Sequence, residues 1–148
     1  MTERSPIEGV EFLLDALDPR PGTSVLAIDT GPASAAVAER VGPRGRVRVA
    51  SSATRAHEFA QQEKFDRIYA LDVPELREDT AAVAALAPLL TDDGQLWVID
   101  DAGPGEDTGT VSMTVSTVLA QAGFAIVDIL ERGSRIAVWA AVGRPHHG

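Results

Sequence analysis

Along the chain, short apolar runs that are typical of strands alternate with segments whose apolar residues have the spacing typical of helices. Runs bounded by turn residues predict six strands: Ser24–Asp29, Arg46–Val49, Arg67–Asp72, Gln95–Asp100, Phe124–Glu131 and Arg135–Val142. Apolar residues three or four positions apart predict the helices: Pro6–Leu17, Ala33–Val41, Ser52–Gln62, Pro74 to about Leu90, and Val111 to Ala122. Strands and helices are therefore expected in alternation along almost the whole chain.

This alternation indicates an α/β fold with a Rossmann-like, doubly wound sheet of about six strands and helices on both faces. The sheet is expected to be mostly parallel. Only the turn Arg132-Gly133-Ser134 separates the last two strands, so the final strand is expected to run antiparallel. The length of 148 residues predicts a single domain over 1–148, with flexible ends at 1–5 and 143–148.

Composition narrows the classes of function. The net charge of −9 argues against a nucleic-acid partner, because phosphates require a basic surface. The chain has no cysteine, which excludes disulfides, thiolate nucleophiles and cysteine metal sites. The N-terminus lacks the basic and apolar regions of a signal peptide, and no apolar run approaches the roughly 18 residues of a membrane span. We therefore expect a cytoplasmic protein with no membrane partner.

Five segments follow one another along the chain: PGTSVLAIDTGPAS, GPRGRV, FDRIYALDVPEL, LLTDDGQLWVID and GSRIAVWAAVG. In this order they resemble the class I S-adenosylmethionine-dependent methyltransferase fold, over about residues 7–143. PGTSVLAIDTGPAS resembles the first strand of that family and its acid-x-Gly-x-Gly-x-Gly turn, and GPRGRV resembles the lead into the second strand. FDRIYALDVPEL and LLTDDGQLWVID resemble the fourth and fifth strands, and GSRIAVWAAVG resembles the antiparallel end. The chain is also similar to small actinobacterial proteins with the same shortened layout, which implies a bacterial source. The resemblance implies that S-adenosylmethionine would bind at the turn after the first strand.

The residues that would hold this cofactor depart from the family pattern. Ala27 stands where the family has an acid, and Asp29 and Ala33 replace two of the three glycines, so that only Gly31 remains. These glycines let the backbone approach the cofactor without a Cβ in the way. Ser51 stands at the place of the acid that binds the ribose hydroxyls. The departures predict a degenerate member of this class.

The segment 51–64 is too short for all that the family places between its second and fourth strands. One helix fits there, but a further strand with its own helix does not, so the second predicted strand is expected at an edge of the sheet. Arg46 and Arg48 are then most simply explained as charges that prevent edge-to-edge aggregation. The alternative is that this edge pairs with another copy or a partner strand, giving a possible homodimer.

Acidic residues lie at or just after the carboxyl ends of the predicted strands: Asp29, Asp72, Asp100 and Asp101. Ligands of open α/β sheets bind outside these ends, near the switch point between the first and third strands. Clustered carboxylates could bind a cationic ligand or a divalent metal. The alternative, which we favour for all four and most for the last two, is that Asp ends strands because its side chain bonds nearby backbone.

The positions expected to touch a cofactor, if one binds, are Asp29, Thr30, Gly31, Ser51 and Asp72. No metal ligand is predicted, and no catalytic residue can be assigned. The one histidine inside the fold, His57, is expected on the surface of a polar helix. The aromatic residues of the strands are expected in the core rather than at a substrate: Tyr69, Trp97 and Trp139.

Two functions remain open at this stage. The favoured hypothesis is a degenerate methyltransferase-like domain that is non-catalytic, uses no cofactor and binds a protein partner or small ligand at the carboxyl ends of its strands. The alternative is an S-adenosylmethionine-dependent small-molecule methyltransferase with a rebuilt pocket. In that case Gly31 and the turn backbone would lie under the cofactor, with Asp29 or Asp72 near its sulfonium.

Overall fold

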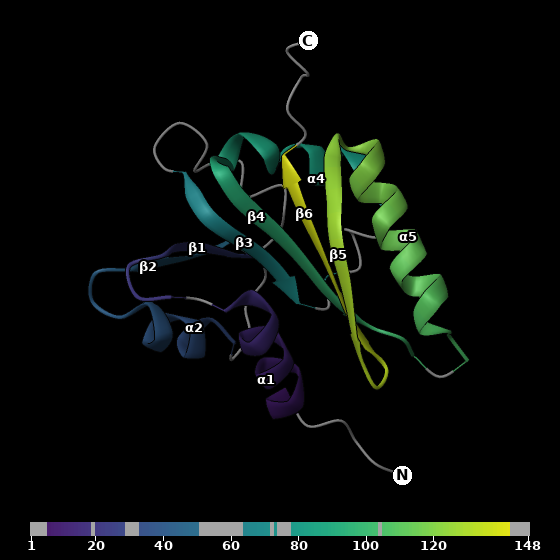
Figure 1. Cartoon of the computed structure of the whole chain (residues 1–148), viewed down its shortest axis with the longest axis horizontal. Coiled ribbons are helices and arrows are strands. Elements are labelled where there is room, and N and C mark those ends of the chain that lie inside the picture. The colour runs from purple at the N-terminus through teal and green to yellow at the C-terminus, as the bar shows by residue number, and fades with distance from the viewer. Residues whose placement is uncertain are drawn as a thin grey trace.

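The computed structural model describes residues 6–18, 20–28, 33–50, 64–71, 73, 78–103 and 105–142. In this part of the chain six strands form one sheet in the order β2-β1-β3-β4-β6-β5 (Figure 1). The strands are β1 (Ser24–Ile28), β2 (Arg46–Ala50), β3 (Phe65–Leu71), β4 (Leu90–Asp101), β5 (Phe124–Arg132) and β6 (Arg135–Val142). β2, β1, β3 and β4 are parallel, and β6 runs antiparallel between β4 and β5. The predicted α/β class, mostly parallel sheet and antiparallel final strand are confirmed.

Helices cover both faces of this sheet. The helices are α1 (Pro6–Leu17), α2 (Ala33–Val41), α4 (Thr80–Ala84) and α5 (Thr108–Gln121), with a short 3₁₀ helix at Ala87–Leu89. Residues of α1 and α2 pack into one apolar cluster, and residues of α4 and α5 pack into the other. Figure 1 shows α1 and α2 on one side of the sheet and α5 beyond β5 on the other. No helix in these described ranges has the length and apolar character needed to cross a membrane.

The apolar run of β1 shows why the central strands need two covered faces. Val25 and Ala27 point into the cluster under α1 and α2, whereas Leu26 and Ile28 belong to the cluster under α4 and α5. All four side chains are at most 1% exposed. A strand buried on both sides has no polar positions to alternate with, which explains its continuous apolar sequence.

The long helix predicted from Pro74 to about Leu90 is wrong in its extent. The described part of that segment holds only α4 and the 3₁₀ helix. Asp79 caps α4, because its carboxylate accepts a hydrogen bond from the Ala82 N–H at 3.0 Å. The helix ends at Ala84, four residues before Pro88. Proline has no N–H to donate to that position, and its ring crowds the carbonyl four residues earlier.

The strand predicted at Gln95–Asp100 also begins earlier than expected, at Leu90. Leu90 pairs with Phe65 and Gln95 pairs with Arg67, so four residues of β4 lie opposite one of β3. The Asp-Asp-Gly segment that precedes the predicted strand is therefore a bulge inside a longer strand. Gly94 suits it, because a Cβ there would lie 2.8 Å from the Leu90 Cδ2.

β2 is the end strand of the sheet within the described residues, as the sequence predicted. It pairs with β1 from Arg46 to Ala50.

In a parallel edge strand, alternate N–H groups point away from the neighbouring strand. We expect the amides of β2 to alternate between slow and fast hydrogen exchange, differing by at least about tenfold. Exchange followed by NMR in a dilute sample tests this, and uniform protection would mean that another strand covers the edge.

Candidate functional site

The carboxyl ends of the parallel strands meet at one edge of the sheet, where a ligand of this fold class is expected. Ile28 lies in register with Ala50 of β2 and with Ala70 of β3, and Leu71 lies in register with Ile99 of β4. In the sheet, β1 lies between β2 and β3, so the chain continues from β1 to β2 on one side of β1 and then to β3 on its other side. The switch point between β1 and β3 is therefore present, as predicted.

The five predicted cofactor positions follow these strand ends in sequence but fall outside the described residues: Asp29, Thr30, Gly31, Ser51 and Asp72. His57 and both predicted tails lie outside them as well. Their placement at the switch point stays a prediction.

The two acids at the end of β4 are described, and Asp100 is not an open carboxylate on a rim. Asp100 is only 5% exposed, and its Oδ1 accepts a hydrogen bond from the Asp101 N–H at 2.9 Å. Asp101 lies opposite Arg135 of β6, and the next amide, Ala102 N–H, donates to the Ser134 carbonyl at 2.7 Å. The prediction that the Asp100 side chain hydrogen-bonds nearby backbone is confirmed. Its burial and local bond leave it poorly placed to receive a ligand.

The acidic loop after β4 is likewise held by its own side chains. The Glu106 carboxylate accepts a hydrogen bond from the Gly103 N–H at 2.8 Å, and the Glu106 N–H donates to the Gly103 carbonyl at 2.9 Å. Asp107 caps α5 by accepting from the Thr110 N–H at 3.2 Å. Each of these carboxylates satisfies backbone donors that would otherwise be unpaired. The residues described at this loop form a hydrogen-bonded turn and the start of α5, and in the described ranges no cluster of three potential metal ligands occurs.

Ala27 is a described residue at a position where the resemblance implies an acid. It pairs with Val49 and Tyr69 near the end of β1, and its side chain is fully buried. Its cluster includes Phe12 and Leu13 of α1. At the position where the resembled family has an acid, this chain therefore carries a methyl group inside an apolar core.

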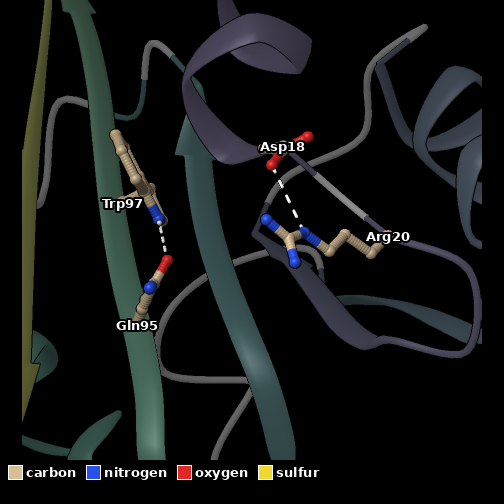
Figure 2. Close-up of polar contacts among 4 residues, drawn as sticks. All are labelled: Asp18, Arg20, Gln95 and Trp97. Carbon is tan, nitrogen blue, oxygen red and sulfur yellow. Dashed lines mark hydrogen bonds and ion pairs between the residues drawn. The ribbon is translucent and has the colours of Figure 1, made fainter.

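Tyr69 and Trp97 are in the core, as predicted, whereas Trp139 is only partly buried and packs against the core. Trp97 is 5% exposed and stacks on Trp139 of β6, with ring centroids 5.6 Å apart and planes 7° apart. The Trp97 Nε1–H donates to the Gln95 Oε1 at 3.0 Å on the same strand (Figure 2). Tyr69 is 2% exposed, and desolvation raises the pKa of its hydroxyl. A phenol that is harder to ionise is a poor general base near neutral pH.

A polar cluster at the amino ends of the strands was not foreseen from the sequence. The Asp66 carboxylate accepts from the Ser24 N–H at 3.1 Å and thereby joins β3 to β1. Next to it, desolvation lowers the pKa of Arg67, and the nearby Asp66 carboxylate partly opposes that shift. Arg20 forms an exposed ion pair with Asp18 at 3.4 Å (Figure 2). These contacts lie opposite the expected ligand end, so they are structural.

Comparison with solved structures shows which fold this chain has. No protein-family model matches the sequence, and no curated protein matches it either. Among solved structures, fibrillarin from Aeropyrum pernix, in complex with natively bound S-adenosyl-L-methionine, is similar with a TM-score of 0.68 and 17% identity, over 93% of this chain and 75% of that one. An S-adenosylmethionine-dependent O-methyltransferase from Thermotoga maritima has a TM-score of 0.69 and 12% identity, over 100% and 69%. A precorrin-6y C5,15-methyltransferase from Geobacter metallireducens has a TM-score of 0.64 and 13% identity, over 97% and 94%.

Proposed function

We propose that this chain, which has the class I S-adenosylmethionine-dependent methyltransferase-like fold, binds a partner or small ligand at the carboxyl ends of its strands without transferring a methyl group. The observation that carries the proposal is the burial of Ala27. A methyl group in this apolar core offers no oxygen to a ligand, at the position where the resemblance leads us to expect an acid. Its neighbours Phe12 and Leu13 supply no hydrogen bond in its place.

Three described acids at this edge support the same proposal. Asp100 is buried and bonded to the backbone, so it is not an anionic contact for a sulfonium. Glu106 and Asp107 are bonded to backbone donors of their own loop. The sequence adds Ser51 at the place of the ribose-binding acid and a single remaining glycine, Gly31, in the turn. A cofactor bound here would therefore lack several of its usual contacts.

A second candidate function is a working methyltransferase with a rebuilt pocket. One observation favours it: the similar fibrillarin, matched over 93% of this chain, carries natively bound S-adenosyl-L-methionine. Methyl transfer depends largely on positioning, so the lack of an assigned base does not exclude it. In this candidate the cofactor would be held by the turn at Asp29, Thr30 and Gly31.

Titration calorimetry with S-adenosylmethionine and S-adenosylhomocysteine separates the two candidates. The favoured proposal predicts no measurable heat with either compound at about 100 µM folded protein, which corresponds to a Kd weaker than about 1 mM. Binding of either compound with a micromolar Kd would contradict it and favour the methyltransferase.

A control variant identifies where any heat comes from. In a rebuilt pocket, Gly31→Val would place a branched side chain where the backbone must approach the cofactor, and the heat should disappear. Comparing the two compounds tests the acidic strand ends, because only S-adenosylmethionine carries the cationic sulfonium. If S-adenosylmethionine binds more tightly, and Asp72→Asn removes the difference, the alternative function is supported and the favoured one fails.

A further inference from the structure

Two buried N–H donors on one face of the sheet have no hydrogen-bond partner in the described part of the chain. They are the Arg67 Nε–H of β3 and the Trp139 Nε1–H of β6. A buried donor without an acceptor has lost its hydration and gained nothing in return, so native proteins leave few of them unpaired. Guanidinium and indole nitrogens only donate. Both groups therefore require an acceptor that the described residues do not supply.

The sheet register places the two donors close together. Arg67 lies two residues before Tyr69 on β3, so its side chain points toward the cluster under α1, against which Trp139 also packs. β4 runs between β3 and β6, and on it Arg67 pairs with Gln95, whereas Trp139 pairs with Trp97. Strands lie about 4.8 Å apart, which puts the Cα atoms of Arg67 and Trp139 roughly 12 Å apart. Two such long side chains can reach a common ligand across this distance.

The residues of β4 between the two donors do not satisfy them. The Gln95 Oε1 accepts from the Trp97 Nε1–H at 3.0 Å (Figure 2), which leaves the NH2 group of the same amide, a further donor, for a ligand. The Trp139 ring stacks on the Trp97 ring, and this contact uses no N–H. Arg67, Gln95 and Trp139 are each partly exposed, so a small ion can approach them from solvent.

The carboxylates near Arg67 are bonded elsewhere. The Asp66 Oδ2 accepts from the Ser24 N–H at 3.1 Å, and the Asp66 main-chain carbonyl accepts from the Arg67 Nη1–H at 3.1 Å. Asp18 pairs with the exposed guanidinium of Arg20 at 3.4 Å. Burial lowers the pKa of Arg67, the Asp66 charge partly opposes that shift, and the positive charge of Arg20 adds to it. An anion beside Arg67 would offset both its burial and its repulsion by Arg20.

We propose that this part of the sheet face binds a small oxyanion, a carboxylate or phosphate group, between Arg67 and Trp139. One oxygen accepts from the Arg67 Nε–H, and another accepts from the Trp139 Nε1–H. Hydrogen bonds between a guanidinium and an ionised oxygen are shorter and stronger than those between neutral groups. The site lies toward the amino end of β3, away from the switch point, so the inference is independent of the proposed function.

Two-dimensional ¹H–¹⁵N NMR of the full chain tests the site, because an indole N–H and a buried arginine Nε–H each give their own signal. Titration with sodium phosphate should move the Trp139 and Arg67 signals along a saturable curve, with a Kd on the order of 1 mM. Sodium chloride at matched ionic strength should leave both signals in place. Shifts that follow ionic strength alone would mean that the two donors bind only water, which overturns the proposal.

Sodium acetate as a second titrant distinguishes the two kinds of oxyanion. A lower Kd for phosphate assigns the site to a phosphate group, whereas a lower Kd for acetate assigns it to a carboxylate. Either result supports the oxyanion site, because both ligands offer ionised oxygens to the same donors. Saturation of the two signals by neither anion contradicts it.

Replacing the donors one at a time shows whether they hold the ion. Arg67→Gln should raise the phosphate Kd at least about tenfold, because it removes both the charge and the Nε–H. Trp139→Phe keeps an aromatic ring against Trp97 and should raise the Kd about threefold through the loss of one donor. Arg132→Gln is the matched control, since Arg132 is an exposed arginine that pairs with Asp15 at the carboxyl end of β5, and its Kd should equal that of the native chain.

Far-UV circular dichroism checks that each variant is folded. If Arg67→Gln does not fold, Trp139→Phe decides the question, with the Arg67 signal as the readout. A folded Trp139→Phe or Arg67→Gln variant that binds phosphate as tightly as the native chain overturns the proposal. So does a loss of binding in Arg132→Gln that equals the loss in Arg67→Gln.

Discussion

Replacing Trp97 by alanine is expected to lower the free energy of unfolding by about 3–5 kcal/mol, the usual cost of truncating a large buried aromatic side chain. Trp97 is 5% exposed and stacks on Trp139. It lies in β4, between β3 and β6, on the face that α1 covers. Removal of the indole would leave a cavity between the parallel half of the sheet and the antiparallel hairpin.

Urea denaturation followed by far-UV circular dichroism measures this loss. Trp97→Phe is the matched control, because it keeps an aromatic ring and should cost less than half as much as alanine. Near-UV circular dichroism reports on the stacked pair itself, and its signal should weaken in both variants. A loss below about 1 kcal/mol for Trp97→Ala would mean that the two sheet halves do not depend on this contact.

Replacing Ala27 by aspartate is expected to cost at least about 3 kcal/mol of stability and to give no binding of S-adenosylmethionine. The side chain at this position is fully buried, in a cluster with Phe12, Leu13 and Leu17 of α1. A carboxylate there would lose its hydration without gaining a partner. Restoring the acid of the family pattern should therefore damage the fold rather than rebuild the site.

Ser51→Glu is the matched control for this experiment. It adds the same charge at the place of the second family acid, directly after the last residue of β2 in sequence. Because it follows β2, the end strand of the described sheet, in sequence, it is expected to change the free energy of unfolding by no more than about 0.5 kcal/mol. Denaturation and calorimetry on both variants provide the measurements. If Ala27→Asp were as stable as the native chain and bound the cofactor, the proposed loss of function would be wrong.

Local signals made several elements predictable from residues alone. Pro6–Leu17 and Ala33–Val41 were predicted with the bounds that α1 and α2 have. Turn residues also marked the ends of elements. Gly123, with a φ of +99°, ends α5, and Gly133, with a φ of +62°, closes the hairpin between β5 and β6. These signals act over a few residues, so no partner strand is needed to interpret them.

The candidate site was predictable only in part. The order of strands and helices was sufficient to locate the switch point between β1 and β3, because crossovers in parallel sheets follow one hand. The sequence likewise predicted that acids at strand ends accept hydrogen bonds from nearby backbone, and the Asp100 side chain accepts one. Whether Asp29 and Asp72 approach a common ligand depends on the conformation of the loops after β1 and β3, and the length of a loop does not fix its conformation.

The sequence by itself determined the class of fold and the antiparallel end, since these follow from periodicity and turn residues, and the identity of single positions predicts a weakened cofactor motif. The tertiary structure alone decided how residues 91–94 form a bulge opposite β3 and that the two tryptophans stack on each other. It also decided that Ala27 lies in a sealed core and that Arg67 and Trp139 each keep a buried N–H donor without a partner in the described part of the chain. These features depend on contacts between residues distant in sequence or on side-chain orientation, and a one-dimensional pattern contains neither.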